Sequence, residues 1–223
     1  MKIIAHIKTD FRTKFGLPRQ SGLCEELKGQ IIFEPEYRKE EAFRGLEGFS
    51  HIWVLWKFSE AEREEWSPTV RPPRLGGNKR MGVFATRSPF RPNNIGLSCV
   101  KLDKIDYECP DAPVLYVSGI DMMNGTPVVD IKPYVPIADC KMNATDGFTA
   151  DTKNFSLDVI FSEELLCILP EEKRDGAKQM LSLDPRPSYI TDEDRVFGVE
   201  YAGFDIRFRV KEKKLTVCEV IKL

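Results

Sequence analysis

The run Ser50–Phe58, S-H-I-W-V-L-W-K-F, is nearly continuous in apolar residues and rich in aromatic and β-branched side chains. Such a run predicts a strand that is buried on both faces and central to the core. Further short strands are expected before it and after it. They cover residues 3–7, 30–33, 83–85, 98–102, 114–120 and 128–131.

This series of strands predicts a mainly β protein, α+β overall. Many short strands at close spacing, with little room for long helices, indicate an N-terminal β-barrel of antiparallel or mixed strands. No G-x-G-x-x-G run follows a predicted strand, which argues against a Rossmann-type nucleotide site. We expect the barrel to occupy residues 1–138.

The remaining chain predicts a second, smaller unit. Residues 139–154 are polar and aperiodic, which is typical of a linker or a long excursion. Residues 155–223 predict a small α+β module. It contains a strand at 157–161, a helix at 171–183 and a half-buried hairpin at 204–221. One face of this hairpin is basic, and it is either a contact for RNA phosphates or simply solvated.

Composition limits the functional classes. The chain has 223 residues and a formal net charge of -2, so any RNA binding must come from a local basic patch. No apolar run approaches the ~20 residues of a membrane helix, and the start of the chain lacks a signal-peptide pattern, so a cytoplasmic protein is expected. Six cysteines without C-x-x-C pairs and two histidines predict no metal site. We expect all six cysteines to be reduced, small buried side chains.

The stretch from Arg71 to Leu102 holds seven basic residues and no acidic one. Such one-sided charge in a chain balanced elsewhere indicates an anionic partner. Its many Pro and Gly residues shape the backbone that displays these side chains. On charge alone, a solvated loop that binds nothing specific is the other interpretation. The seven basic residues are Arg71, Arg74, Lys79, Arg80, Arg87, Arg91 and Lys101.

Two further segments are candidate binding elements. Residues 10–24 follow neither a helical nor a strand period, and a loop this long inside a compact domain is either disordered or functional. Asp121 follows a predicted strand and precedes the turn-forming pair Asn124 and Gly125. Its carboxylate either caps that turn or holds a ligand, and both interpretations stay open.

The run Met81–Ser98, M-G-V-F-A-T-R-S-P-F-R-P-N-N-I-G-L-S, and five others closely resemble the signature of the TsaA-like family, in particular its TrmO-type tRNA methyltransferases. They occur in the family's order and cover most of the chain. The other five runs are Phe15–Gln20, Gly45–Val54, Asp121–Pro127, Val128–Tyr134 and Asp184–Tyr189.

The resemblance implies a β-barrel that binds S-adenosylmethionine and a homodimer with sites near the subunit interface. The chain departs from the family pattern at Ser59, Asn124 and Ala5-His6. The residues that the resemblance places near the cofactor are Ser21, Gly22, Leu23, Ser59, Glu60, Arg87, Leu97, Asp121, Asn124, Gly125 and Thr126.

The implied acceptor is the N6 nitrogen of a threonylcarbamoyl-modified adenosine beside the anticodon of tRNA. Arg87 and Arg91 are expected to hold a carboxylate of the substrate or of the donor, because a guanidinium pairs such groups bidentately. Lys132 and Tyr134 are further substrate contacts, and Asp130 or His51 would handle the proton. The residues expected to contact tRNA are Arg71, Arg74, Arg80, Arg186 and Tyr189.

Three functions therefore remain open on the sequence alone. The first is methylation of this tRNA adenosine. The second is a related methyl transfer to another RNA or to a small molecule. The third is a non-catalytic RNA-binding or adaptor protein that keeps the barrel. Donor binding and acceptor specificity would separate the three.

Overall fold

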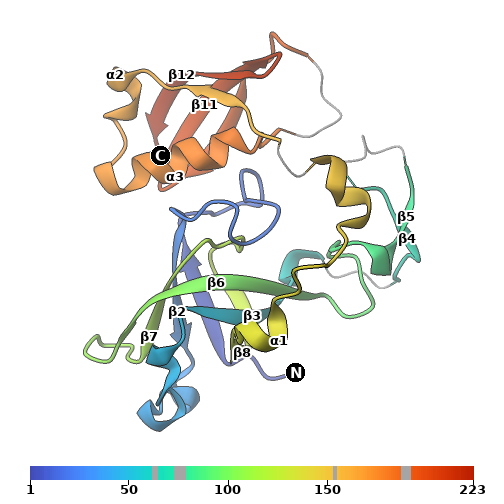
Figure 1. The fold of residues 1–223 in the computed structure, drawn as a ribbon. Helices are drawn as coiled ribbons and strands as arrows, with labels where there is room; N and C mark the ends of the chain where they lie inside the picture. The colour runs from blue at the N-terminus through green and yellow to red at the C-terminus, as the bar shows by residue number, and fades with distance from the viewer. Residues whose placement is uncertain (62–64, 73–78, 153–154, 187–191) are drawn as a thin grey trace.

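The structure is a computed structural model that describes residues 1–61, 65–72, 79–152, 155–186 and 192–223. Six strands close into an antiparallel barrel in the order β1-β2-β7-β6-β3-β8 (Figure 1). The predicted mainly β fold is confirmed. The barrel strands are β1 (Ala5–Thr9), β2 (Lys28–Phe33), β3 (His51–Lys57), β6 (Ile95–Asp106), β7 (Val114–Ser118) and β8 (Thr126–Pro133).

Strand β3 lies at the centre of the barrel wall, between β6 and β8. Its burial alternates: Ile52, Val54 and Trp56 are buried, whereas the residues between them are partly exposed. The expectation that both faces are buried was therefore wrong. The apolar outer side chains Trp53 and Leu55 made the run look uniformly buried, although they lie on the outer face of the barrel.

Short elements connect the barrel strands. A two-stranded sheet pairs β4 (Thr69–Val70) with β5 (Met81–Gly82). The predicted strand at 83–85 is wrong, because these residues form a 3-10 helix in which only Val83 is buried. A four-residue helix α1 (Pro136–Asp139) follows the barrel. The other 3-10 helices among the described residues are Pro35–Tyr37, Glu40–Ala42, Leu46–Gly48, Ser59–Ala61 and Gly147–Thr152.

The C-terminal module is a four-stranded sheet in the order β10-β11-β12-β9 with two helices, α2 (Glu163–Leu166) and α3 (Glu171–Ser182). Helix α3 lies between this sheet and the barrel (Figure 1). As its period predicted, Ala177, Met180 and Leu181 are buried. The strands are β9 (Asp158–Ile160), β10 (Phe197–Tyr201), β11 (Phe204–Lys211) and β12 (Lys214–Lys222).

The barrel and the C-terminal module share one apolar core. The loop of residues 10–27, which joins β1 to β2, lies between them and contributes Phe11, Cys24 and Leu27, each 1% exposed. All six cysteines are free, but Cys140, Cys167 and Cys218 are exposed, so the expectation that all six are buried was wrong. No helix in the described ranges is long and apolar enough to cross a membrane.

Substituting Gly96→Ala should destabilise the barrel, because a Cβ there would lie 2.2 Å from Cε2 of Trp56. Overpacking of this kind costs about 1–3 kcal/mol. Urea denaturation followed by tryptophan fluorescence should show a lower midpoint. Gly48→Ala is the matched control, because nothing lies within 4 Å of its Cβ position. Equal midpoints for the two variants would contradict the close contact between Gly96 and Trp56.

Candidate active site

The candidate site is built on an unpaired edge of β6. This strand pairs with β3 from Ile95 to Lys101, but with β7 only from Lys101 onward. The 10–27 loop meets the edge that this leaves open, where the amide of Cys99 donates to Oγ of Ser21 at 3.0 Å. Because alternate amides of a strand point to the same side, the amide of Leu97 faces this edge as well.

Asp121 lies beside this edge and is held by a chain of hydrogen bonds. The indole of Trp56 donates to Oγ of Ser98 at 2.9 Å, and that hydroxyl donates to Oδ1 of Asp121 at 2.6 Å. Burial raises the pKa of Asp121 to about 6, against the opposing effects of Ser98, the Ser21 amide and the positive charge of Arg87. A buried carboxylate with a perturbed pKa is typical of a functional site.

Arg87 extends from the basic loop toward the same place. Its Nη1 donates to Oε1 of Gln20, and its charge acts on Asp121. Gly22, one residue after Ser21, donates its amide to the carbonyl of Gly119 at 2.8 Å. The structure therefore brings together four of the predicted cofactor residues, from three separate segments: Ser21, Gly22, Arg87 and Asp121.

Arg91 is engaged within its own loop. Its Nη1 donates to the carbonyls of Thr86 at 2.7 Å and Val83 at 3.2 Å. Nδ2 of Asn94 donates to the carbonyl of Pro89 at 2.6 Å, which ties the end of the same loop. These bonds give Arg91 a role in shaping the loop that carries Arg87. Its predicted contact with a carboxylate stays a prediction.

The predicted catalytic residues of β3 and β8 share the outer face of the barrel. Across the sheet, Asp130 lies level with Leu55 and Leu97, and Lys132 lies level with Trp53 and Cys99. The Lys132 ammonium lies 3.0 Å from Oδ2 of Asp130. This face is therefore continuous with the β6 residues whose free edge meets the 10–27 loop.

His51 and Tyr134 lie further along this face, with ring centroids 6.3 Å apart. Nδ1 of His51 lies 2.9 Å from Oγ of Ser50. Because Asp130 is level with Leu55, four residues from His51, the two are separated by about 13 Å along the strand. Asp130 and His51 therefore cannot both act on one proton.

The remaining predicted cofactor residues lie after β3, in the 10–27 loop and at the start of β8. Ser59 and Glu60 are exposed in the turn after β3. Leu23 is 45% exposed beside Gly22. Asn124 is bound to the end of β1 and to the start of the 10–27 loop. Its Oδ1 accepts from the Thr9 amide at 3.1 Å, and its backbone amide donates to the Phe11 carbonyl at 2.8 Å.

Gly125 and Thr126 continue this attachment to β1. The amide of Gly125 donates to the carbonyl of Ile7 at 2.8 Å, and Thr126 is buried and pairs with Ile7. With the Asn124 side chain engaged by β1, a contact of Asn124, Gly125 or Thr126 with a cofactor stays a prediction. Asp121 interacts with the β6 edge instead of capping the turn that follows it.

The predicted tRNA contacts that lie within the described residues divide into two sets. Arg71 and Arg80 are exposed and flank the β4–β5 ladder: Arg71 follows β4 and Arg80 precedes β5. Arg186 instead makes a bidentate pair with Asp184, at 2.8 and 2.9 Å, and is only 15% exposed, which argues against its contact with RNA. Arg74 and Tyr189 lie outside the described residues.

Sequence reasoning missed the residues that support the site. Neither Ser98 nor Trp56 was expected to support Asp121, although their hydrogen-bond chain holds it. The buried hydroxyl of Ser98, inside an otherwise apolar strand, is the signal that could have found them. In the parts of the chain that the structure describes, no three His, Cys, Asp or Glu side chains gather closely enough to hold a metal ion.

Comparison with known proteins assigns the chain to a family. The model of the tRNA-methyltransferase O N-terminal domain matches residues 6–140, and that of the TrmO C-terminal domain matches residues 155–223. The tRNA (adenine(37)-N6)-methyltransferase of Escherichia coli strain K12 is 40% identical, over 94% of this chain and 92% of the relative. The enzyme of the same name from Eikenella corrodens is 42% identical, over 78% of this chain and 97% of the relative.

A solved structure agrees with both sequence matches. The crystal structure of TrmO from Pseudomonas aeruginosa superposes with a TM-score of 0.78 at 32% identity, and the match covers 98% of this chain and 96% of that one. Both domains of the family are matched, in order, and the resemblance that the sequence motifs indicated is confirmed. This chain therefore belongs to the tRNA-methyltransferase O family.

Proposed function

We propose that this protein methylates N6 of adenosine 37 in tRNA, with S-adenosylmethionine as the donor. The single observation that carries the proposal is the convergence of Asp121, Arg87 and Ser21 at the open edge of β6. The relatives named tRNA (adenine(37)-N6)-methyltransferase support the same reaction.

The chemistry of these residues fits the donor. S-adenosylmethionine carries a sulfonium, an amino group, a carboxylate and an adenine. Asp121 offers a buried carboxylate for a cationic group, and Arg87 offers a guanidinium for the carboxylate. The Leu97 amide, which faces the open edge, offers a backbone donor to the adenine or ribose.

The donor supplies an electrophilic methyl group: the acceptor nitrogen forms the new N–C bond in line as the S–C bond breaks and its electrons return to sulfur. The chain must align the acceptor, exclude water and accept the proton of the nitrogen. Asp130 is level with Leu97 across the outer face, whereas His51 is about 13 Å further along. We therefore assign proton removal to Asp130, and contact with the remainder of the modified base to Lys132 and Tyr134.

The acceptor that this site suits best is a threonylcarbamoyl-modified adenosine. Its amide-like nitrogen is a weak nucleophile, so a nearby carboxylate base is needed. Its threonine carboxylate gives a cation such as Lys132 an anion to bind.

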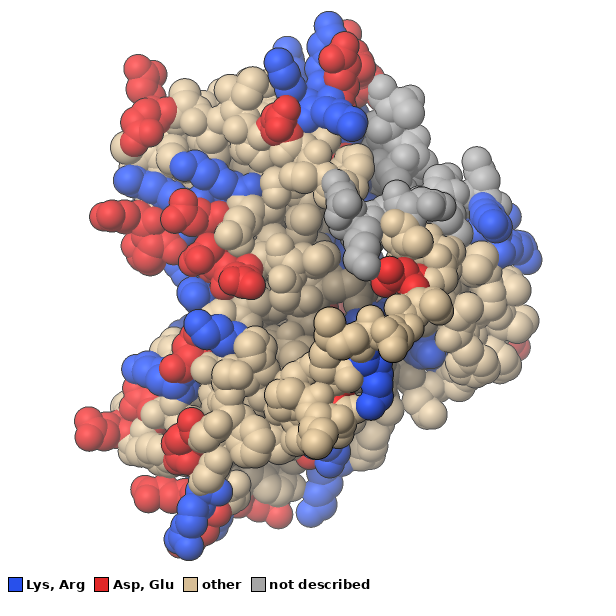
Figure 2. All heavy atoms as spheres, viewed as in Figure 1, with Lys and Arg blue, Asp and Glu red and all other residues tan. Residues whose placement is uncertain are grey.

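Contact with the rest of the tRNA is assigned to the exposed Arg71 and Arg80. Figure 2 shows Lys and Arg interleaved with Asp and Glu along the left side of the view, whereas the middle of this face carries few charged side chains. Because the net charge is -2, contact with RNA would be confined to a local set of basic side chains. We further propose a cytoplasmic homodimer. Apolar residues exposed after β8, Ile137 at 92% and Met142 at 89%, would suit burial by a second copy.

The test is methyl transfer from labelled S-adenosylmethionine to tRNA with and without the threonylcarbamoyl group. We expect label only in the modified tRNA. Arg87→Ala should lower kcat/KM about 30- to 150-fold, the effect of losing about 2–3 kcal/mol of a charge-assisted contact. Arg87→Lys should recover only part of the lost kcat/KM, because an ammonium cannot make the bidentate pair that a guanidinium makes. Arg44→Ala, an exposed arginine in the turn before β3, is the matched control.

Other outcomes favour the other two functions. Label in neither tRNA, with the donor still bound in calorimetry, would point to a different acceptor. Absence of donor binding would point to a non-catalytic RNA-binding or adaptor protein.

Affinity for S-adenosylmethionine should rise with pH between 5 and 7. The pKa of Asp121 is raised to about 6, so its carboxyl is mostly protonated at pH 5 and ionised at pH 7. Because the donor's cation prefers the carboxylate, Kd should fall about tenfold over this range. Calorimetry on Asp121→Asn should give weak binding without this pH dependence, and the exposed Asp158→Asn should behave as wild type. A flat profile in wild type would exclude a contact between Asp121 and the donor's cation.

A further inference from the structure

We infer that the C-terminal module holds the 10–27 loop in the shape that donor binding requires, and that Lys173 of α3 is a positioning residue for that binding. The inference rests on the proposed function, because it concerns the same donor site. It assigns to α3 and β10 a task beyond contact with tRNA.

The start of the loop is fixed by the C-terminal module. Nζ of Lys173 lies 2.6 Å from Oδ2 of Asp10, and both side chains are 25% exposed. The amide of Ala202 donates to the carbonyl of Asp10 at 3.1 Å. Phe11 packs its ring 5.3 Å from that of Tyr201. Asp10 therefore receives two bonds, from α3 and from the turn after β10.

The middle of the loop packs against the same module without space to move. A Cβ on Gly16 would lie 2.3 Å from Cγ2 of Val199, and its φ of +91° favours glycine. On the facing helix, a Cβ on Gly176 would lie 2.5 Å from the hydroxyl of Tyr201. Glycine at both positions lets the loop, α3 and β10 approach closely.

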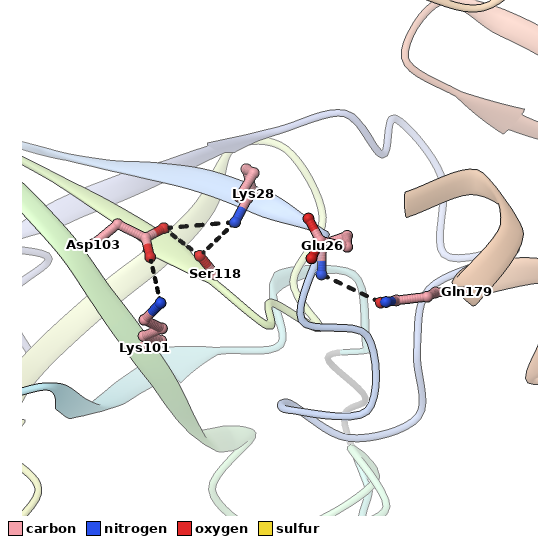
Figure 3. Close-up of polar contacts among 6 residues, drawn as sticks. All are labelled: Glu26, Lys28, Lys101, Asp103, Ser118 and Gln179. Atoms are coloured by element: carbon pink, nitrogen blue, oxygen red, sulfur yellow. Dashed lines mark hydrogen bonds and ion pairs between the residues drawn. The ribbon is translucent and has the colours of Figure 1, made fainter. Parts of the chain in front are cut away.

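The end of the loop is bound on both sides (Figure 3). The Glu26 amide donates to Oε1 of Gln179 on α3 at 3.3 Å. Two residues later, Nζ of Lys28 lies 3.0 Å from Oγ of Ser118, which donates in turn to Asp103. The loop thus leaves α3 and enters the barrel wall over three residues.

Between these anchors lie the residues that reach the donor site. Gln20 accepts from Arg87, Ser21 accepts from the Cys99 amide, and the Gly22 amide donates to Gly119. A segment held at both ends and in its middle by one module cannot shift without moving these contacts. The Asp10–Lys173 pair is the charged anchor, and at this exposure it is less screened than a surface pair.

The test compares Lys173→Met with Lys178→Met. Lys178 lies on the same helix, is exposed, and makes no ion pair among the described residues. We expect Kd for S-adenosylmethionine to weaken three- to tenfold in Lys173→Met, and KM for modified tRNA to change by less than twofold. Lys173→Arg should restore binding, and Lys178→Met should match wild type. A general loss of structure would instead raise both constants together.

A double-mutant cycle separates loss of the Asp10–Lys173 interaction from misfolding of a single variant. If Lys173 acts through Asp10, then Asp10→Asn should weaken donor binding similarly, and the double variant should be no worse than either single one. Unchanged Kd in Lys173→Met, or additive losses in the double variant, would overturn the inference alone. Failure of the wild-type protein to bind S-adenosylmethionine would overturn the proposed function, and this inference with it.

Discussion

The open edge of β6 is the constraint on which the site depends. A closed barrel normally pairs both edges of every strand, and a buried backbone group without a partner is costly. Here β6 passes from β3 to β7 near Lys101, so residues 95–100 keep one edge without a strand partner in the described structure. The 10–27 loop satisfies the Cys99 amide at this edge through Ser21. The geometry that closes the barrel thus also creates the place where a ligand can meet backbone amides.

The sequence predicted the barrel better than it predicted the local structure of its strands. Alternating or apolar runs identified the six barrel strands to within a few residues, because most of them bury one face in the core. The strand predicted for Val83–Ala85 was wrong, because three apolar residues are too few to show a strand period. Hydrogen bonds to the next residue, such as that from the Thr86 hydroxyl to the Val83 carbonyl, stabilise a 3-10 helix instead. The strand predicted for Ser50–Phe58 was wrong only in its burial. Trp53 lies on the outer face, where its indole donates to Asp139, and the apolar character of the run does not indicate this contact.

Sequence patterns indicated separate segments of the candidate site, but only the family resemblance brought those segments together in one site. Its contacts join residues far apart in the chain: Ser21 to Cys99, and Asp10 to Lys173. No spacing rule connects such pairs, because the connection is made by strand order and by the path of a loop without period. The basic stretch did point to Arg87 by charge. It could not separate Arg87, whose charge acts on Asp121, from Arg91, which binds its own loop.

Asp121 shows why the site and the stability of the protein are linked. A carboxylate that burial holds at a pKa of about 6 makes the folded state less favourable as pH rises through that value, because ionisation is easier in the unfolded chain. An apolar residue at position 121 would avoid this cost, but it would leave the hydroxyl of Ser98 and the amide of Ser21 without their acceptor. The cost is offset when a cation occupies the site and favours the ionised form. A cationic donor would therefore stabilise the carboxylate that binds it, and the donor site and the Asp121 cluster would form as one unit.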